Sequence, residues 1–260
     1  MHLVLIPIGS AGDVHPYVGI GCELARRGHR VTVLTNEHFR TLVERAGLEF
    51  VASSSEEEYR QAVKDPRLWD PMRGFEFVAR HSFLPLIGVV YQYLRERHVP
   101  GETLVVGASF AWGARIAQEK LRIPLVTLHL QPAMFPSLEE TPRYTGAAWV
   151  SRLPRLLKRA CLHLIDRVTD GIVAQEINAF RASVGLAPVR RILREWTHSP
   201  LSTIGLFPEW FARPGLTGRR VSGLPDFRST TWTTCSPCRR TSTYFSRPVR
   251  LPSSSRRARR

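Results

Sequence analysis

Short apolar runs alternate along the chain with longer segments in which apolar residues recur every three or four positions. Such runs are typical of strands buried in a sheet, and the longer segments are typical of helices with one apolar face. Strands and helices that alternate in this way form a parallel sheet with right-handed crossovers. The pattern therefore predicts an α/β fold, a Rossmann-like parallel sheet flanked by helices. Strands are predicted at 3–8, 30–35, 48–52, 104–106, 123–130 and 203–207.

The segments between these strands differ in their pattern. The polar segment at 53–64 is assigned no helix, and the paired Asp and Pro residues at 65–71 predict turns. Pro85 interrupts one helical segment. The helices predicted from apolar spacing lie at 16–28, 37–46, 74–98 and 109–121, and a last helix starts at 153 and continues through 175–184.

The first predicted strand runs into a turn made of small residues. Gly9 and Gly12 allow a tight turn and leave room for a ligand near the backbone, and Pro16 fits the first turn of the helix that follows. In open parallel sheets, ligands bind in the crevice at the carboxyl ends of the strands. This places Asp13 and His15 at the mouth of a predicted binding site.

Composition changes the picture near the end of the chain. The sequence carries 37 Lys and Arg against 22 Asp and Glu, but residues 213–260 hold 12 of the Arg and a single acid, so residues 1–212 are only mildly basic. The tail is rich in Arg, Ser, Thr and Pro without any period, which predicts disorder. Its Cys235 and Cys238 form a lone C-x-x-C, and no metal site is predicted. The body has no basic patch interleaved with aromatic residues, so we expect no nucleic-acid partner.

The chain contains no apolar run of about eighteen residues and begins with a predicted strand, so neither a membrane span nor a secretory signal is expected. The expected compartment is the cytoplasm, with Cys22 and Cys161 reduced. Residues 153–167 combine apolar residues at helical spacing with many Arg. This pattern suits a domain helix with a solvated face, which we favour, or a basic helix resting on the inner face of an anionic membrane.

The opening stretch, MHLVLIPIGSAGDVHPYVGIGCELARRGHRVTVLT, resembles the start of the two-domain glycosyltransferases of the sterol and antibiotic glucosyltransferase group, whose glycine-rich turn ends in G-D-V-x-P. Further stretches follow in order and resemble most closely the rhamnosyltransferases of rhamnolipid synthesis. They are DPRLWDP at 65–71, VVGASFAWGARIAQEKLRIP at 105–124, EINAFRASVGL at 176–186 and LFPEWFA at 206–212.

The resemblance implies a GT-B architecture, in which an N-terminal acceptor domain faces a C-terminal domain that holds the nucleotide sugar. Transfer proceeds with inversion and needs no metal or resident cofactor, and the donor, such as dTDP-rhamnose or a UDP-sugar, is a co-substrate. Asp13 matches the aspartate proposed as the base in this group, and His15 takes the variable position beside it. Plant relatives pair a histidine of this loop with an aspartate after a later strand, but that strand here runs into Gly107, Ala108 and Ser109.

The candidate site has a catalytic and a substrate-binding part. Asp13 and His15 are the candidate bases, because a positioned carboxylate or imidazole can remove the proton of an attacking hydroxyl. Each has a plainer alternative, a helix cap for Asp13 and a surface histidine for His15. A lipid-like or small-molecule acceptor favours apolar walls, although each large apolar side chain could equally belong to the core. The predicted substrate-binding residues are Gly9, Ser10, Gly12, Trp112, His129, Met134 and Phe135.

Two regions are predicted on this basis. Residues 1–212 form the acceptor-binding domain of a GT-B fold, and residues 213–260 form a disordered tail, interpreted as a frameshifted or truncated remnant. The expected function is transfer of a hexose, rhamnose by the closest resemblance, from a nucleotide diphosphate to a hydroxyl, with the first region inactive when it lacks a donor domain. The alternative is a non-catalytic module that binds a lipid or a partner protein.

Overall fold

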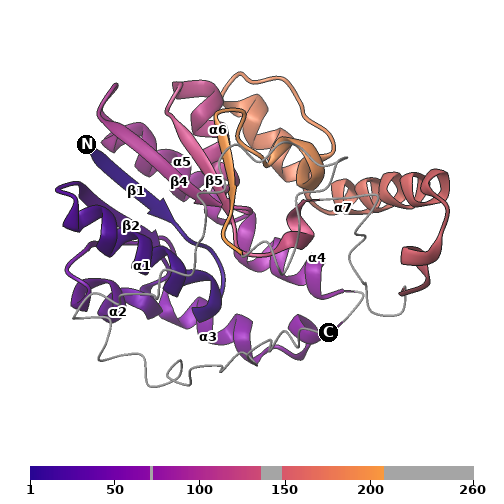
Figure 1. Ribbon diagram of the computed structural model, residues 1–260, viewed down its shortest axis with the longest axis horizontal. Helices are drawn as coiled ribbons and strands as arrows, with labels where there is room; N and C mark the ends of the chain where they lie inside the picture. Colours follow the sequence, from indigo (N-terminus) through magenta and orange to yellow (C-terminus); the bar gives the residue numbers. More distant parts are fainter. Residues whose placement is uncertain (71–72, 136–147, 208–260) are drawn as a thin grey trace, which may run out of the picture.

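The computed structural model describes residues 1–70, 73–135 and 148–207. The predicted disordered tail, and the predicted domain boundary at residue 212, lie outside these ranges. Within them, six strands form one sheet in the order β3-β2-β1-β4-β5-β6 (Figure 1). The strands are β1 (His2–Ile6), β2 (Arg30–Thr35), β3 (Glu49–Ala52), β4 (Thr103–Ala108), β5 (Leu125–His129) and β6 (Ser202–Gly205).

Every pair of neighbouring strands is parallel, and β1 lies between β2 and β4. This confirms the predicted parallel sheet, and the first strand lies in its interior. Alternate residues of β1 enter two separate clusters of buried side chains, Leu3 and Leu5 in one and Val4 and Ile6 in the other. A strand with apolar residues at every position is required here, because both of its faces are covered.

Helices cover both faces of the sheet (Figure 1). On one face, α1 (Ala11–Arg26) and α2 (Arg40–Arg45) pack on the cluster that contains Leu3 and Leu5. On the opposite face, α5 (Leu86–Arg97), α6 (Trp112–Leu121) and the C-terminal half of α7 (Arg155–Ser183) pack on the other cluster. The predicted break at Pro85 falls between α4 (Gly74–Val78) with its π-helical continuation η3 (Ala79–Phe83) and α5. The remaining short helices are η1 (Glu37–Phe39), α3 (Glu56–Lys64), η2 (Pro66–Trp69), η4 (Pro132–Met134), η5 (Ala148–Arg152) and η6 (Ile192–Trp196).

The structure differs from the sequence prediction at α3, which forms where no helix was assigned. None of its residues is buried, and only Tyr59 packs against the core, so its apolar face is too small to give a periodic signal. Its start is fixed by a capping box, in which the Ser55 backbone N–H donates to Glu58 Oε2 at 2.7 Å and the Glu58 N–H donates to Ser55 Oγ at 3.2 Å. The Arg60–Glu56 ion pair, one turn apart at 2.7 Å, adds local support.

Two helix boundaries also differ. The first helix begins at Ala11, so Pro16 lies in its second turn and not in the first. The helix predicted to continue from 153 through 184 is α7, which begins at Arg155 and ends at Ser183. None of the helices in the described ranges is long and apolar enough to cross a membrane.

Candidate active site

The glycine turn between β1 and α1 lies at the carboxyl edge of the sheet. Gly9 has a φ of +134°, a backbone conformation that residues other than glycine rarely adopt. A Cβ atom at Gly9 would lie 2.2 Å from Asp13 Oδ2, so the turn also requires glycine for space. Ser10, Ala11 and Gly12 are exposed at this edge. The loop therefore has an open backbone surface next to a single carboxylate.

Asp13 is the third residue of α1, and its carboxylate is held by the residue that caps this helix. The Ser10 backbone N–H donates to Asp13 Oδ2 at 2.8 Å, and the Ser10 hydroxyl lies 3.1 Å from the same oxygen. The side chain is half-buried. Both bonds use Oδ2, so the capping role predicted as the plainer alternative is present in the structure. The carboxylate also lies in the first turn of α1, where the helix dipole is positive and attracts negative charge.

The neighbourhood of Asp13 ties the turn to a later strand. Tyr17 follows one helical turn after Asp13 and donates its hydroxyl to the Leu128 carbonyl of β5 at 3.1 Å. Burial, and secondly the Asp13 charge, raise the pKa of Tyr17 well above its usual value. His15 is exposed on the same helix. Tyr17 is therefore a fixed neutral donor that anchors the start of α1 to the sheet.

His129 ends β5 on the opposite side of the sheet from Tyr17. Its side chain is fully buried, with Nδ1 2.5 Å from Ser109 Oγ and Nε2 2.9 Å from Nδ1 of His198. Thr197 closes this group by donating its hydroxyl to the Ser109 carbonyl. Burial, and secondly the charge on His198, lower the pKa of His129 to about 3. The imidazole is therefore neutral at physiological pH and bonded on both nitrogens.

Of the two predicted pocket residues after β5, Phe135 packs against this histidine pair. The Phe135 ring meets His129 edge-on, with centroids 4.8 Å apart, and lies 5.9 Å from His198 and from Phe207. Phe135 and Met134 are both half-buried. They present an apolar rim at the carboxyl end of β5, as an apolar acceptor requires.

Trp112 is placed differently from the other predicted pocket residues. It is 1% exposed and packs edge-on against Phe83 and Phe110 in the core. Its burial, like that of His129, argues against direct contact with an acceptor.

Two members of the buried polar group, Ser109 and His198, were not predicted from sequence as partners of His129. Nothing in the sequence near either residue indicates this contact: Ser109 lies where the fourth predicted strand passes into a predicted helix, and His198 lies in a short loop without a period.

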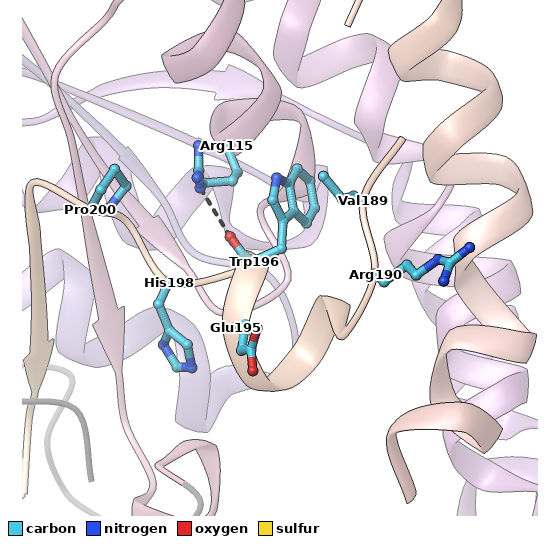
Figure 2. A pocket seen from close by; sticks show the side chains of 7 residues that line it. All are labelled: Arg115, Val189, Arg190, Glu195, Trp196, His198 and Pro200. Atoms are coloured by element: carbon cyan, nitrogen blue, oxygen red, sulfur yellow. Dashed lines mark hydrogen bonds between the residues drawn. The ribbon is translucent and has the colours of Figure 1, made fainter. Parts of the chain in front are cut away.

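A shallow pocket of about 280 Å³ opens beside the histidine pair and not at the glycine turn. Figure 2 shows the Arg115 guanidinium directed at the Trp196 carbonyl, to which it donates at 3.0 Å, while Arg190 points away from the pocket. His198 lines this pocket and connects it through hydrogen bonds to His129 and Ser109. None of the residues predicted for the site lines it. In the described ranges, no three His, Cys, Asp or Glu side chains gather as a metal site would require.

Comparison with known proteins agrees with this architecture. The family model of the glycosyltransferase family 28 N-terminal domain matches residues 3–134, half of the chain, and the chain belongs to this family. The fold is that of the N-terminal domain of GT-B glycosyltransferases. The solved structure of the glycosyltransferase VinC in complex with dTDP superposes with a TM-score of 0.52 at 13% identity, over 83% of this chain and 51% of VinC.

Two curated relatives illustrate the sequence similarity. A sterol 3-beta-glucosyltransferase of Komagataella phaffii is 33% identical over 131 residues, which are 50% of this chain and 10% of that protein. The O-mycaminosyltylonolide 6-deoxyallosyltransferase of Streptomyces fradiae is 27% identical over 217 residues, 79% of this chain and 47% of that protein. The chain thus spans half or less of the length of these relatives. The predicted kinship with sterol and antibiotic glycosyltransferases is confirmed.

Proposed function

We propose that this domain binds the acceptor for an inverting glycosyl transfer and that Asp13 is the base. The observation that carries the proposal is the placement of Asp13: a carboxylate at a helix N-terminus, beside an open glycine turn, at the edge of a parallel sheet where ligands bind. The acceptor hydroxyl would lie against this turn. His15, exposed slightly further along α1, is the alternative base.

The reaction needs one proton transfer and one displacement. The acceptor oxygen loses its proton to the Asp13 carboxylate as it forms a bond to the anomeric carbon of the donor sugar. The bond from that carbon to the nucleotide diphosphate breaks, and the diphosphate leaves with the electron pair. Ser10 holds one carboxylate oxygen in place through two hydrogen bonds, which fixes the orientation of the base.

The proposed donor is a nucleotide diphosphate sugar, such as dTDP-rhamnose or a UDP-sugar, held by a separate donor domain. The dTDP in the VinC structure supports this class of donor. A lipid-like acceptor is supported by the name of the sterol 3-beta-glucosyltransferase and by the apolar rim of Met134 and Phe135. Rhamnose as the sugar rests on the motif resemblance alone. The proposed place of action is the cytoplasm, at or near the inner face of the membrane.

The test joins the acceptor domain to a donor domain, so that both substrates can be held together. Residues 1–212 are fused to the donor domain of a rhamnosyltransferase relative, and nucleotide release is measured with a hydroxylated lipid acceptor. We expect the unfused residues 1–212 to release no nucleotide, because positioning of both substrates supplies roughly 7–11 kcal/mol of the barrier. In the fusion, Asp13→Asn should slow transfer about a hundred- to ten-thousandfold, the usual contribution of a general base.

The matched control is His15→Asn in the same fusion, which should retain most of the activity. If His15→Asn abolishes transfer and Asp13→Asn does not, His15 is the base. A non-catalytic binding module is the second candidate function, and the capping bonds to Asp13 favour it, because they give the carboxylate a structural role. That candidate is supported if the fusion binds the acceptor but releases no nucleotide above the rate of the donor domain alone.

A further inference from the structure

The two halves of α7 (Arg155–Ser183) have opposite relations to the rest of the molecule. The C-terminal half is docked: Val173 and Ile177 are fully buried in the core, and the Asp170 carboxylate accepts the backbone N–H of Ile192 at 2.9 Å. The N-terminal half extends away from the sheet (Figure 1). The contacts of the docked half fix the rotation of the helix, so the face that the projecting half turns outward is also fixed.

This outward face is apolar. Leu157 is 52% exposed, Leu164 62% and Val168 58%, and Ala160 is also exposed. The spacing from 157 to 160, 164 and 168 places these side chains in one stripe along the helix. Exposed large apolar side chains that form a contiguous patch mark an interaction surface. The patch widens with Leu156, 81% exposed, and Trp149 of the preceding turn η5, 57% exposed.

The inward face of the same half carries two charged residues, which differs from the expected arrangement of apolar residues inside and polar residues outside. Lys158 and Asp166 are buried together with Leu162. Asp166 Oδ2 lies 2.6 Å from Arg194 Nη2, so the short helix η6 supplies the counter-charge of Asp166. A rotation that buried the apolar stripe would expose Leu162 and separate this ion pair. The favoured sequence interpretation, a domain helix with a solvated face, therefore does not describe this segment.

The charges around the stripe have one sign. Arg152 of η5 and Arg167 of α7 are exposed, and the only acid between residues 148 and 168 is the buried Asp166. Apolar side chains between exposed arginines suit a surface that offers hydrocarbon at one depth and negative charge just above it. A second copy of the same face would bring arginines against arginines, which is unfavourable.

We propose that the projecting half of α7, together with η5, is the site at which this protein rests on an anionic lipid bilayer. Leu157, Leu164 and Val168 enter the acyl boundary, and the arginines contact the lipid phosphates. The proposal does not depend on sugar transfer, because it uses no residue of the glycine turn. It also assigns a place on the molecule to peripheral membrane contact.

The experiment is co-sedimentation of the full chain with vesicles, either of phosphatidylcholine alone or of phosphatidylcholine with phosphatidylglycerol. The basic residues at 213–260 can themselves attract anionic vesicles, so the decisive variant keeps every charge. This is Leu157→Ser with Leu164→Ser and Val168→Ser. We expect the parent to bind the anionic vesicles and the variant to bind about tenfold or more weakly, since binding scales with inserted apolar area.

The matched control replaces exposed apolar residues on other elements, Val63→Ser, Val89→Ser and Leu201→Ser, and should bind as the parent does. A second measurement does not rely on the triple variant folding: brominated lipid should quench the parent fluorescence, and Trp149→Phe should remove most of that quenching. Circular dichroism checks that each variant keeps its helices.

Equal binding by the parent and the Leu157, Leu164, Val168 variant would overturn the proposal, because the basic tail would then explain the attraction. Absence of parent binding to anionic vesicles would overturn it as well. If the parent is a dimer without lipid and the triple serine variant is a monomer, a second copy of the chain covers the stripe and the proposal is overturned.

Discussion

Two parts of the same sheet edge, the glycine turn after β1 and the histidine pair at the end of β5, carry the polar chemistry of this domain in different ways. At the turn, one carboxylate lies beside exposed backbone, with Asp13 half-buried and Gly9 and Ser10 exposed. At β5, His129 and His198 are buried and bonded to each other. A position at the edge of the sheet therefore does not by itself expose a residue to a ligand. Whether the residue is exposed also depends on the face of the sheet on which it lies.

The strand pleat explains the separation. Leu128 and His129 are consecutive, so their side chains point to opposite faces of the sheet. Leu128 belongs to the cluster under α1, where its carbonyl accepts the Tyr17 hydroxyl, and His129 meets Ser109 and His198 on the other face. The turn and the histidine pair are thus joined through one peptide unit but lie on opposite sides. We expect the turn to affect catalysis and the histidine pair to affect stability.

The largest effect on stability is expected at Trp112, which the sequence analysis assigns to the pocket but which is buried in the structure. Trp112→Ala should destabilise the protein by about 3–5 kcal/mol, as is usual when a buried Trp is truncated. Urea unfolding of the full chain measures the change. Trp69→Ala, at a side chain 77% exposed, is the control and should cost far less. A small loss for Trp112→Ala would mean that this side chain lines an open cavity after all.

Gly9→Ala tests the turn itself. The new methyl group would need the space of the Asp13 carboxylate, and a φ of +134° is unfavourable for alanine. Strain of this kind costs on the order of 1–3 kcal/mol. Gly28→Ala is the matched control, because its φ is also positive, at +84°, but its Cβ would meet nothing within 4 Å. If both variants lose the same stability, the contact with Asp13 adds nothing to the backbone strain.

Acid should lower the stability of the protein through the buried His129. The pKa of His129 is about 3 in the folded protein, against about 6.5 in an unfolded chain. Between these values the unfolded state binds the extra proton, so stability falls as pH falls below 6.5, at up to about 1.4 kcal/mol per pH unit. Between pH 6.5 and 5 this amounts to about 2 kcal/mol. Urea midpoints across this range should show a shallower slope for His129→Asn than for the parent.

Much of this fold could be predicted from sequence, because burial leaves a pattern. The apolar run at 3–8 and the β-branched run at 30–35 correspond to β1 and β2, and the glycine turn was placed at the right edge. What could not be predicted is set by contacts across the sheet. Apolar spacing shows that α7 is a helix but not which face is turned inward, since the buried Asp166 is held by Arg194, far along the chain. Similarly, nothing local to His129 announces its partner His198.

The smallest effect on stability should come from Asp13, and it separates the two roles of this carboxylate. Asp13→Ala removes the acceptor of both Ser10 bonds, and loss of such a cap costs about 1 kcal/mol. Asp13→Asn keeps an amide oxygen at the same place and should lose only part of that stability. In the fused enzyme, however, both variants lack a base and should be equally slow. Urea unfolding and nucleotide release measured on the same pair of variants therefore give different rankings if Asp13 is both cap and base. Activity that follows stability, with Asp13→Asn nearly as fast as its parent, would leave Asp13 a structural cap and move the search for the base to His15.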